Sequence, residues 1–496
     1  MKTILTNRGY AIIKQHFNFK DINRTRKELT VSPFINDSYG ANSPTFPVYL
    51  ESPNKIYLPK HYGYETFGIP DKIKHLDKGL DIDLDFNGTL RDTQKTPVEL
   101  FLKSCEEGPL TQNSKGGIIS LACGGGKTII SLYLLSILKK KTLIIVHKDF
   151  LINQWKERIN QFLPFARVGL IQGSKINIKN KDIVIGMLQS ISMKEYPIET
   201  FKDFGFTIID ECHHIGAEVF SRALPKINSY YSLGLSATPK RKDGLSKVFH
   251  WFLGPTIYEN KTRKGLLPIN INVVMYNYND ISYNRIETTN IGKVCMPRMI
   301  NNITECKRRT EIILYLLKLL ISQNKKILIL SDRRNHLTYI YDQVLERNIG
   351  TIGYYVGGMK PNELKKTEGK QIILGTYTMS SEGMDIPDLD AVIFGSPRSD
   401  IIQSIGRILR KKHAFNPICW DIVDDFSVFP NQYTKRRVHY RKMNYPIKIY
   451  NILDIFGTNI DTMLQQFNQT PLEDIKRRKK KKKEDIINEY SFIDET

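Results

Sequence analysis

A glycine-rich segment ends in a lysine and a threonine, the residue types that hold the phosphates of a nucleotide. It reads CGGGKT over residues 123–128, between the apolar runs GIISLA and IISLYLLSIL. Backbone N–H groups at a helix start bind anions, because they point at the ligand and the helix dipole favours negative charge. The order of elements therefore predicts a strand, a phosphate-binding loop and a helix. Leu121 stands where the strict G-x-x-x-x-G-K-T pattern has its first glycine.

The predicted loop gives each of its residues a role. Backbone groups would surround the phosphates, Lys127 would reach the β and γ phosphates, and the Thr128 hydroxyl would hold Mg²⁺. The alternative is a chance glycine-rich turn without a ligand. On the first interpretation the cofactors are ATP and Mg²⁺, and the cofactor-binding residues of the loop are Ala122, Cys123, Gly124, Gly125, Gly126, Lys127 and Thr128.

An acidic pair, Asp210 and Glu211, follows the apolar run FTII and argues against a chance turn. Asp210 comes 83 residues after Lys127, at the end of a later predicted strand. There it would hold the same Mg²⁺ through water, while Glu211 would orient and deprotonate the attacking water. The two motifs together predict hydrolysis of ATP.

Hydrolysis also needs positive charge on the leaving phosphates, and the segment QSIGRILR supplies it. Its arginines, Arg407 and Arg410, are three residues apart and so would lie on one face of a helix. Arginines brought to the nucleotide from a second domain would couple nucleotide state to domain closure. The alternative is a basic helix that faces solvent.

The elements that must position these residues form two α/β units of similar size. Short apolar runs alternate with amphipathic segments, which predicts parallel sheets covered by helices on both faces. Expected strands are GIISLA, TLIIV, DIVIGM, FTIID and YYSLGL in the first unit, and KILILS, TIGYYV, QIILGT, DAVIFG and ICWDIVD in the second. DFLINQWKERINQFL is expected to be a helix with Asp149 as its N-cap.

The domain boundaries follow from these patterns. We expect an α+β accessory domain over 1–85, an α/β domain over 86–255, a linker over 256–299, a second α/β domain over 300–430 and a basic extension over 431–496. The extension includes KRRKKKKK, residues 476–483, a block that predicts a solvated tail. This tail would add phosphate affinity or act as a nuclear localisation signal.

Composition indicates a polyanionic partner. The 496 residues carry a net charge of +22, which nucleic acid or an anionic membrane face would balance. The chain has no run of about 18 apolar residues and no secretory segment, so we expect nucleic acid and no membrane. The six cysteines form no C-x-x-C pair, which favours a reducing, intracellular setting over a zinc site or a disulfide framework.

Six segments, in this order, resemble the motifs of superfamily 2 DExH helicases: LRDTQ, LACGGGKT, DECH, SAT, GTYTMSSEGMDIP and QSIGRILR. The stretch LGLSATPKRKDG is similar to XPB-type helicases, although Lys242 replaces the glutamate of their R-E-D element. The pattern also resembles helicases of large nucleocytoplasmic DNA viruses, including the poxviral transcript-release helicase. The resemblance implies two tandem RecA-like domains that together form an ATP-driven motor.

The resemblance also implies roles for single residues. Adenine would be recognised by Gln94, and the nucleotide would be sensed or approached from the second domain by Gly383, Asp385 and Gln403. Contacts to the sugar–phosphate backbone would come from His147, Lys148, Gln189, Ser190 and Thr376. Coupling between hydrolysis and the nucleic-acid track would involve His213, Ser236 and Thr238.

Some patterns leave two interpretations open. His213 and His214 could bind zinc, but no third ligand is apparent. Trp155, Tyr230 and Tyr231 are expected in the core rather than as stacking platforms. KRRVHYRKMNYPIK, residues 435–448, mixes basic and aromatic residues as nucleic-acid surfaces do, and as an exposed helix packed by its tyrosines does too.

The favoured function is an ATP-dependent helicase or translocase on DNA, in viral transcription or repair and with proteins of those processes as partners. An RNA helicase of the same architecture is the alternative, because these motifs contact the backbone. The XPB-like triplet and the lack of D-E-A-D favour DNA. A non-helicase P-loop NTPase, a non-catalytic binder and a translocating nuclease fit less well. A viral protein of this kind would work in the virion or host cytoplasm, or in the nucleus if the tail directs it there.

Overall fold

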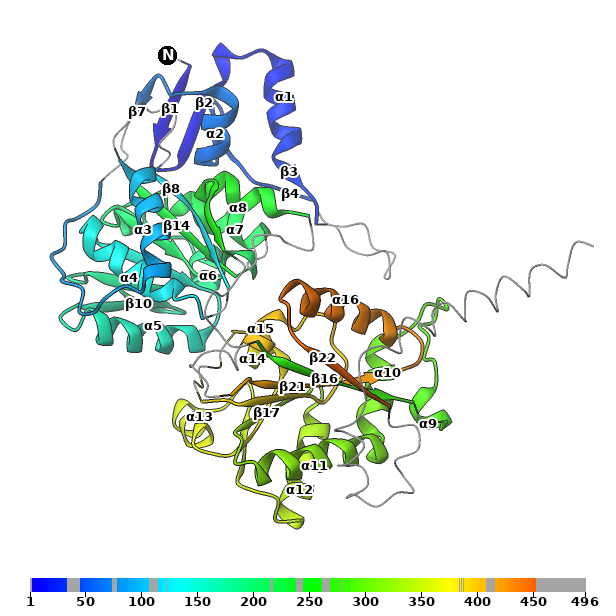
Figure 1. Ribbon diagram of the computed structural model, residues 1–496. Helices are drawn as coiled ribbons and strands as arrows, with labels where there is room; N and C mark the ends of the chain where they lie inside the picture. Colours follow the sequence, from blue (N-terminus) through cyan, green and yellow to red (C-terminus); the bar gives the residue numbers. More distant parts are fainter. Residues whose placement is uncertain are drawn as a thin grey trace, which may run out of the picture. The chain divides into compact units, whose positions relative to one another are not determined.

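The computed structural model describes residues 2–33, 45–73, 78–106, 115–122, 124–214, 217–237, 244–260, 268–277, 279–382, 384, 386, 388–406 and 415–451. The chain divides into two compact units, Met1–Arg263 and Lys264–Thr496 (Figure 1). None of the helices in the described ranges is both long and apolar enough to cross a membrane.

The first unit begins with a small sheet and two helices, α1 (Phe19–Glu28) and α2 (Lys60–Phe67). The described strands of this sheet follow the order β5-β6-β2-β1-β7. Their bounds are Thr3–Thr6 for β1, Gly9–Ile13 for β2, Leu50–Glu51 for β5, Lys55–Leu58 for β6 and Lys72–Ile73 for β7. A separate pair joins β3 (Thr30–Val31) to β4 (Phe46–Pro47).

This N-terminal region is docked on the α/β domain that follows it. Tyr62 of α2 packs edge-on against Trp251, with ring centroids 5.3 Å apart. Asn228 Nδ2 donates to the carbonyl of Thr6 at 2.6 Å. The Lys60 ammonium is buried and donates to the Tyr230 carbonyl at 3.4 Å, and burial lowers the pKa of Lys60 to about 8.

A larger sheet of the first unit carries the predicted strands. Its described strands follow the order β11-β10-β12-β9-β13-β14-β8-β15, all parallel except β11. The bounds are Gly116–Leu121 for β8, Thr142–Val146 for β9, Val168–Gln172 for β10, Lys175–Asn177 for β11, Ile183–Met187 for β12, Phe206–Ile209 for β13, Tyr231–Ser236 for β14 and Thr256–Asn260 for β15. The predicted α/β class with parallel sheets is confirmed.

Helices cover both faces of this sheet because successive strand residues point to opposite sides. In β9, Ile144 and Val146 pack in one core cluster, while Leu143 and Ile145 pack in another. The first cluster is covered by α3 (Asp92–Cys105), α4 (Lys127–Leu138) and α5 (Asp149–Phe162), and the second by α6 (Leu188–Met193), α7 (Ala217–Ala223) and α8 (Ser246–Leu253). Lys148 is the N-cap of α5, so Asp149 is its first helical residue and not the predicted cap.

The second unit contains a parallel sheet with the described strand order β18-β19-β17-β20-β21-β16-β22. The bounds are Asn270–Tyr276 for β16, Ile327–Leu330 for β17, Ile352–Tyr355 for β18, Ile372–Gly375 for β19, Ala391–Phe394 for β20, Ile418–Asp424 for β21 and Ile447–Asn451 for β22.

Two expected boundaries differ from this arrangement. The segment expected as a linker, 256–299, contributes β15 to the first sheet and β16 to the second. The segment expected as an extension, 431–496, contains β22, which pairs with β16. Asn270 and Asn272 interrupt the apolar run of β16, so its buried strand gives only a weak pattern in the sequence.

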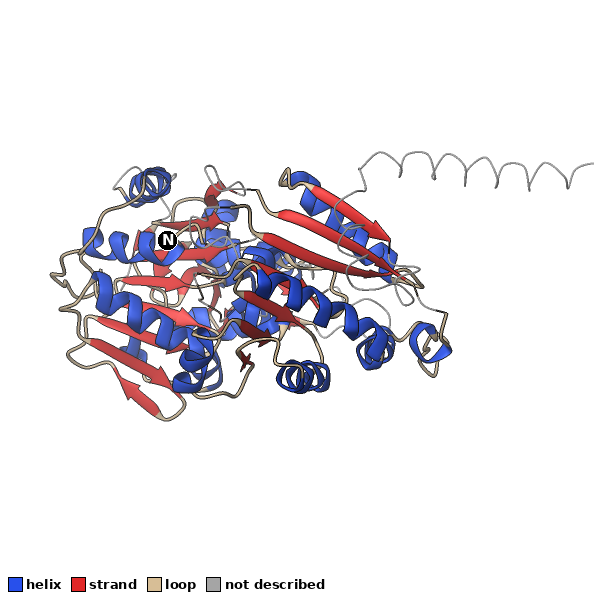
Figure 2. Ribbon diagram, turned by 60° about the horizontal axis from the view of Figure 1, so that its bottom comes forward, coloured by secondary structure: helices blue, strands red, loops and turns tan. Residues whose placement is uncertain are grey.

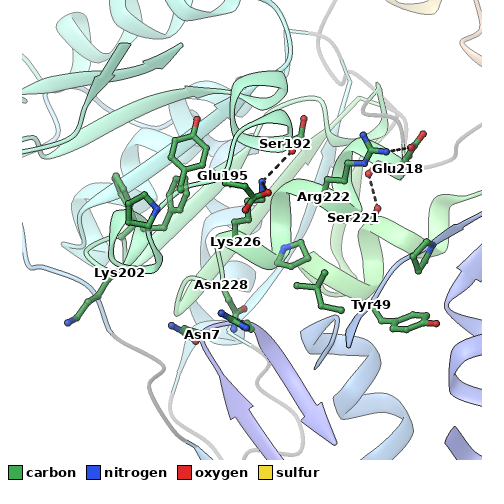
Figure 3. A pocket seen from close by; sticks show the side chains of 18 of the residues that line it. Asn7, Tyr49, Ser192, Glu195, Lys202, Glu218, Ser221, Arg222, Lys226 and Asn228 are labelled. Atoms are coloured by element: carbon green, nitrogen blue, oxygen red, sulfur yellow. Dashed lines mark hydrogen bonds and ion pairs between the residues drawn. The ribbon is translucent and has the colours of Figure 1, made fainter. Parts of the chain in front are cut away.

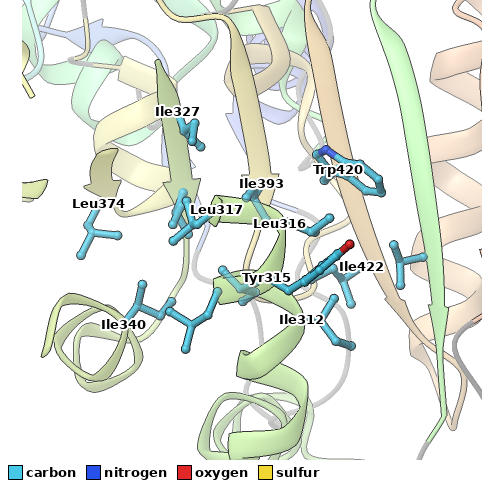
Figure 4. Close-up of a cluster of buried hydrophobic side chains, with 14 of the residues drawn as sticks. Ile312, Tyr315, Leu316, Leu317, Ile327, Ile340, Leu374, Ile393, Trp420 and Ile422 are labelled. Carbon is cyan, nitrogen blue, oxygen red and sulfur yellow. The ribbon is translucent and has the colours of Figure 1, made fainter. Parts of the chain in front are cut away.

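The helices of the second unit pack on both sides of its sheet (Figure 2). One face is covered by α10 (Met296–Glu305), α11 (Lys307–Ser322) and α12 (Arg334–Glu346). Figure 4 shows this core, with Ile312, Leu316 and Leu317 of α11 near Trp420 and Ile422 of β21. The remaining helices are α9 (Ile281–Asn284), α13 (Pro361–Glu368), α14 (Tyr377–Glu382), α15 (Ile402–Ile405) and α16 (Phe429–Lys442).

Strand β21 carries a buried carboxylate toward each face. Asp424 receives two hydrogen bonds from Arg309 of α11, at 2.7 and 3.0 Å, and both side chains are fully buried. Asp421 points to the opposite face and receives two from Arg436 of α16, at 2.8 and 2.9 Å. Each arginine therefore ties a covering helix to the same central strand.

We predict that Arg309→Leu lowers the free energy of unfolding by about 3–5 kcal/mol, because it leaves Asp424 buried without its cation. Denaturant titration of the full chain measures the change. Arg347→Leu is the matched control, since the Arg347–Glu311 pair is about one-third exposed and worth at most about 1 kcal/mol. Equal losses in the two variants would contradict a special role for the buried pair.

Candidate active site

The strands of the first unit end where its predicted chemical residues begin. Strand β8 ends just before the glycine-rich loop, β13 just before Asp210, and β14 at Ser236. Because the carboxyl ends of parallel strands share one edge of a sheet, the three segments meet there. Asp210 and Glu211 thus lie next to the loop that ends at Lys127.

The loop geometry depends on glycine. Gly124 and Gly126 have φ values of +77° and +85°, in the left-handed region that side chains disfavour. Gly126 is also the N-cap of α4, and a Cβ there would lie 2.0 Å from Nε2 of Gln94. Helix α4 starts at Lys127 without a side-chain cap, so its first N–H groups suit an anion.

Gln94 lies against this loop, and of its two amide atoms only the oxygen has a hydrogen-bond partner among the described residues. Its Oε1 accepts from the backbone N–H of Arg91 at 2.8 Å, which fixes the side chain at the start of α3. Its Nε2 is buried and has no hydrogen-bond partner among the residues that the structure describes. A buried donor without a partner is costly, so a nucleotide base that accepts from it would complete the site.

Lys127 and Glu211 form the central contact of the site. Their Nζ and Oε1 atoms are 2.6 Å apart, and the side chains are 10% and 18% exposed. The other carboxylate oxygen of Glu211 accepts from the Ala237 N–H at 3.3 Å. His213 Nδ1 lies 3.4 Å from that oxygen and 3.0 Å from Oγ of Ser236. The loop, the acidic pair and the end of β14 are therefore joined in one polar network.

Backbone strain marks the same position. Glu211 has a φ of +45°, a conformation that residues other than glycine rarely adopt. Strain of this kind persists only where surrounding contacts hold it in place. Here the contacts to Lys127 and Ala237 fix the carboxylate beside the phosphate loop.

Asp210 is a buried carboxylate that favours a nearby cation. Burial raises its pKa, and the charge of Glu211 raises it further, while Lys127 opposes the shift. Trp155 Nε1 donates to Oδ2 of Asp210 at 2.9 Å and holds that oxygen. A divalent cation at the carboxylate would favour the ionised form.

The residues present fit Mg²⁺ bound together with a nucleotide. Mg²⁺ in such sites takes one or two protein oxygens, substrate phosphates and water. Asp210 would supply an oxygen, and Thr128 lies in the first turn of α4. Over the described ranges, no group of three or more His, Cys, Asp or Glu side chains forms a metal cage by itself.

The residues of the first unit that are predicted to contact the nucleic-acid backbone differ in their exposure. Gln189 is exposed on α6, and the Ser190 hydroxyl accepts from the Gly173 N–H at 2.8 Å. Lys148 is half-buried at the start of α5. His147 follows β9, its side chain is buried, and its charge would act on Asp210.

In the second unit, Thr376 follows β19 and is half-exposed. Its hydroxyl accepts from the Met379 N–H at 3.4 Å. Gln403 lies in α15, but its side chain is not described. The predicted site residues outside the described ranges are Cys123, Thr238, Gly383, Asp385, Arg407 and Arg410.

Trp155, which sequence reasoning assigned only to the core, contacts the predicted Mg²⁺ ligand Asp210. Helical spacing with Leu151, Ile152 and Ile159 places it on the buried face of α5, where the structure also has it. The spacing gave no indication that its N–H reaches a carboxylate 55 residues away. Only the packing of α5 beside the end of β13 creates that contact.

A separate cavity of about 690 Å³ lies between the N-terminal sheet and the first α/β domain (Figure 3). Asn7 and Tyr49 line it from one side, and Arg222 and Lys226 from the other. Arg222 pairs with Glu218 at 2.6 Å, and Lys226 donates to main-chain carbonyls. Its charges are thus largely used within the protein, and its lining residues do not include the predicted ATP-site residues.

Comparison with known families matches both units. Residues 87–241 match the family described as type III restriction enzyme, res subunit, and residues 309–412 match the helicase conserved C-terminal domain. Between them, these matches span the phosphate loop, the acidic pair and the QSIGRILR segment.

Individual relatives agree with these families. The chain is 38% identical over 465 residues to a protein of Acanthamoeba polyphaga mimivirus provisionally named ATP-dependent RNA helicase L396, covering 91% of this chain and 88% of that one. It is 25% identical to the provisionally named helicase 161L of Invertebrate iridescent virus 6, over 74% and 84% of the two chains. It is 28% identical to the DNA 3'-5' translocase XPB2 of Sulfurisphaera tokodaii, over 65% and 79%.

We predict that Lys127→Ala abolishes ATP binding, because it removes the cation of the phosphate loop. Glu211→Gln should still bind ATP and hydrolyse it about 10² to 10⁴ times more slowly, since only the base is lost. Fluorescent-nucleotide titration and steady-state ATPase assays measure the two effects. Wild-type turnover by Glu211→Gln would show that another group is the base.

We also predict that Trp155→Phe weakens Mg²⁺ binding by about 10- to 100-fold, because the donor that orients Asp210 is lost while the ring shape is kept. Mg²⁺ titrations of ATPase rate, and of nucleotide binding at fixed ATP, report the shift. Trp251→Phe is the control, because Trp251 packs against Tyr62. It should leave the Mg²⁺ midpoints of both titrations unchanged. An unchanged midpoint in Trp155→Phe would remove the positioning role.

Proposed function

The chain belongs to the superfamily 2 ATP-dependent helicases, and from this premise we propose that it moves along or unwinds DNA by means of the site at residues 122–128, 210–213 and 236–237. The observation that carries this proposal is the contact network from Lys127 through Glu211 to Ala237, His213 and Ser236. It links the groups needed for hydrolysis to the segment that follows β14.

ATP binding would rearrange this network. Phosphate oxygens would compete with Glu211 for the Lys127 ammonium, because both are anions within reach of the same cation. Glu211, released from that pair, would accept a proton from the attacking water. The Gln94 amide would meet the base, and Asp210 with Thr128 would hold Mg²⁺, which supplies charge stabilisation at the phosphates when bound.

The second unit would complete the site and provide the second grip on the track. Arg407 and Arg410 would stabilise charge on the phosphates, Gln403 would approach the γ-phosphate, and Gly383 and Asp385 would sense the nucleotide. Lys148, Gln189 and Ser190 would hold the backbone from the first unit and Thr376 from the second. His213, Ser236 and Thr238 would couple the two events, so that cycles of ATP binding and hydrolysis advance the protein along one strand.

The choice of DNA rests on resemblance to the XPB type. XPB2 is named a DNA translocase, and the LGLSATPKRKDG stretch is similar to that type. The mimivirus relative is named an RNA helicase, so RNA is the second candidate. Relatives from large DNA viruses support a role in viral transcription or repair, with proteins of those processes as partners and the virion, host cytoplasm or nucleus as the place of action.

We predict that duplex or single-stranded DNA stimulates the ATPase more than RNA of equal length and concentration. Steady-state rates with the three nucleic acids in parallel measure this, with Glu211→Gln as the control for contaminating ATPases. Stronger stimulation by RNA would overturn the DNA assignment and leave the motor intact. An absence of stimulation by all three would contradict the motor itself.

A further inference from the structure

Helix α16 presents two chemically distinct faces. It spans Phe429–Lys442, contains no acidic residue and includes the first part of the segment KRRVHYRKMNYPIK, residues 435–442. The helix repeat of 100° per residue separates its side chains into a buried arc and an exposed arc.

The side chains on the inward face of α16 pack against the rest of the second unit. The Arg436 guanidinium is buried and donates twice to Asp421, and the Tyr440 hydroxyl donates to the same carboxylate at 2.8 Å. Tyr433 and Phe429 are also buried. The tyrosines of α16, Tyr433 and Tyr440, therefore pack the helix, and they offer no platform for stacking an unpaired base.

The outward face of α16 carries basic side chains. Lys435, Arg441 and Lys442 are exposed and Arg437 is partly exposed, and their exposed neighbours on the helix are Asn431, Thr434 and Val438. No ion pair joins any of these four cations to a carboxylate within the described part of the chain. Lys435 and Lys442 are seven residues apart, about 10 Å along the axis at 1.5 Å per residue.

Helix stability accounts for only half of this charge. Cations in the last turn, Arg441 and Lys442, stabilise a helix by interacting with its dipole. Lys435 and Arg437 lie in the middle, where the dipole gives no such benefit and like charges repel. At 100° per residue the four cations form two pairs, Lys435 with Lys442 and Arg437 with Arg441, on either side of Val438. Four exposed cations that have no ion pair among the described residues are better explained by an external polyanion.

From the exposed cations on the outward face of α16, a helix that contacts the loop before QSIGRILR through Arg436, we infer a duplex-DNA contact in the second unit, made to phosphates rather than bases. This inference rests on the proposed function and adds a contact outside the helicase motifs. Phosphate contacts by Lys and Arg are independent of sequence. Surfaces that hold single strands add aromatic stacking, which the buried tyrosines of α16 do not provide, so duplex DNA fits better.

Direct contacts connect α16 to the predicted track. Arg436 Nη1 donates to the Arg398 carbonyl at 2.6 Å. The Arg398 guanidinium lies over the Tyr377 ring, 5.5 Å from its centroid, and Tyr377 directly follows Thr376. Two steps of contact therefore separate the basic helix from a residue predicted to touch the backbone. DNA held on α16 would act on the same loop that carries Gln403 and Gly406.

The test replaces the four cations by glutamine, which keeps helix propensity and an unbranched polar side chain but removes the charge: Lys435→Gln, Arg437→Gln, Arg441→Gln and Lys442→Gln in the full chain. Duplex-DNA binding is titrated at several salt concentrations. If all four residues engage phosphates, the slope of log K against log salt should become shallower by about 3.6 units. ATPase without DNA should be unchanged, and melting should show that the variant is folded.

The matched control removes the same charge from exposed residues of and around α13, with Lys360→Gln, Lys365→Gln, Lys366→Gln and Lys370→Gln. A change confined to the α16 variant supports the inference. Equal changes in both variants would mean that only net charge matters, and a wild-type slope in the α16 variant would mean that this face touches a protein or nothing; both outcomes overturn it. If the wild type itself fails to bind DNA, the proposed function falls first and this inference with it.

Discussion

The parallel alignment of the strands is the constraint on which the site depends. Residues as distant in sequence as Lys127 and Glu211 meet at 2.6 Å because β8 and β13 run in the same direction and end at the same edge. Parallel pairing requires crossovers, and the crossovers are the helices that bury both faces of the sheet. The position of the reactive residues and the apolar character of the strands therefore have the same cause, which is burial of both faces of the sheet. A strand that is buried on both faces can present polar side chains to a ligand only at its end.

Acidic and basic side chains lie close together at that edge of the sheet. Asp210 is buried, and the pKa of its carboxyl is raised by burial and by the neighbouring Glu211. The protein offsets this with an ammonium from Lys127 and an indole N–H from Trp155. A nucleotide with a divalent cation brings both signs of charge into the same space, so its arrival redistributes contacts that already exist. That is a physical reason for a nucleotide-dependent switch to be placed here.

The second unit uses charge differently. Asp421 and Asp424 on β21 are neutralised by arginines from opposite faces, and these pairs fix α11 and α16 to the sheet. Arg436 pairs with Asp421 on the inward side of α16, whereas the outward cations of that helix form no ion pair with a carboxylate in the described ranges. A single helix thus has a structural arginine on one side and exposed positive charge on the other, and it contacts the loop that leads toward Arg407 and Arg410.

The sequence by itself determined the α/β class, the strands that carry the phosphate loop and the acidic pair, and the family, since these depend on local patterns: apolar runs, turn residues and short motifs. It missed β16, whose apolar run is broken by two asparagines, and the strand pairing of β15 and β22, because pairing partners are set by distant residues. Only the tertiary structure decided that Trp155 orients Asp210, that His147 is buried, and which face of α16 is basic. Each of these depends on how a helix or loop packs against a sheet, and periodicity identifies a buried face without specifying what that face will touch.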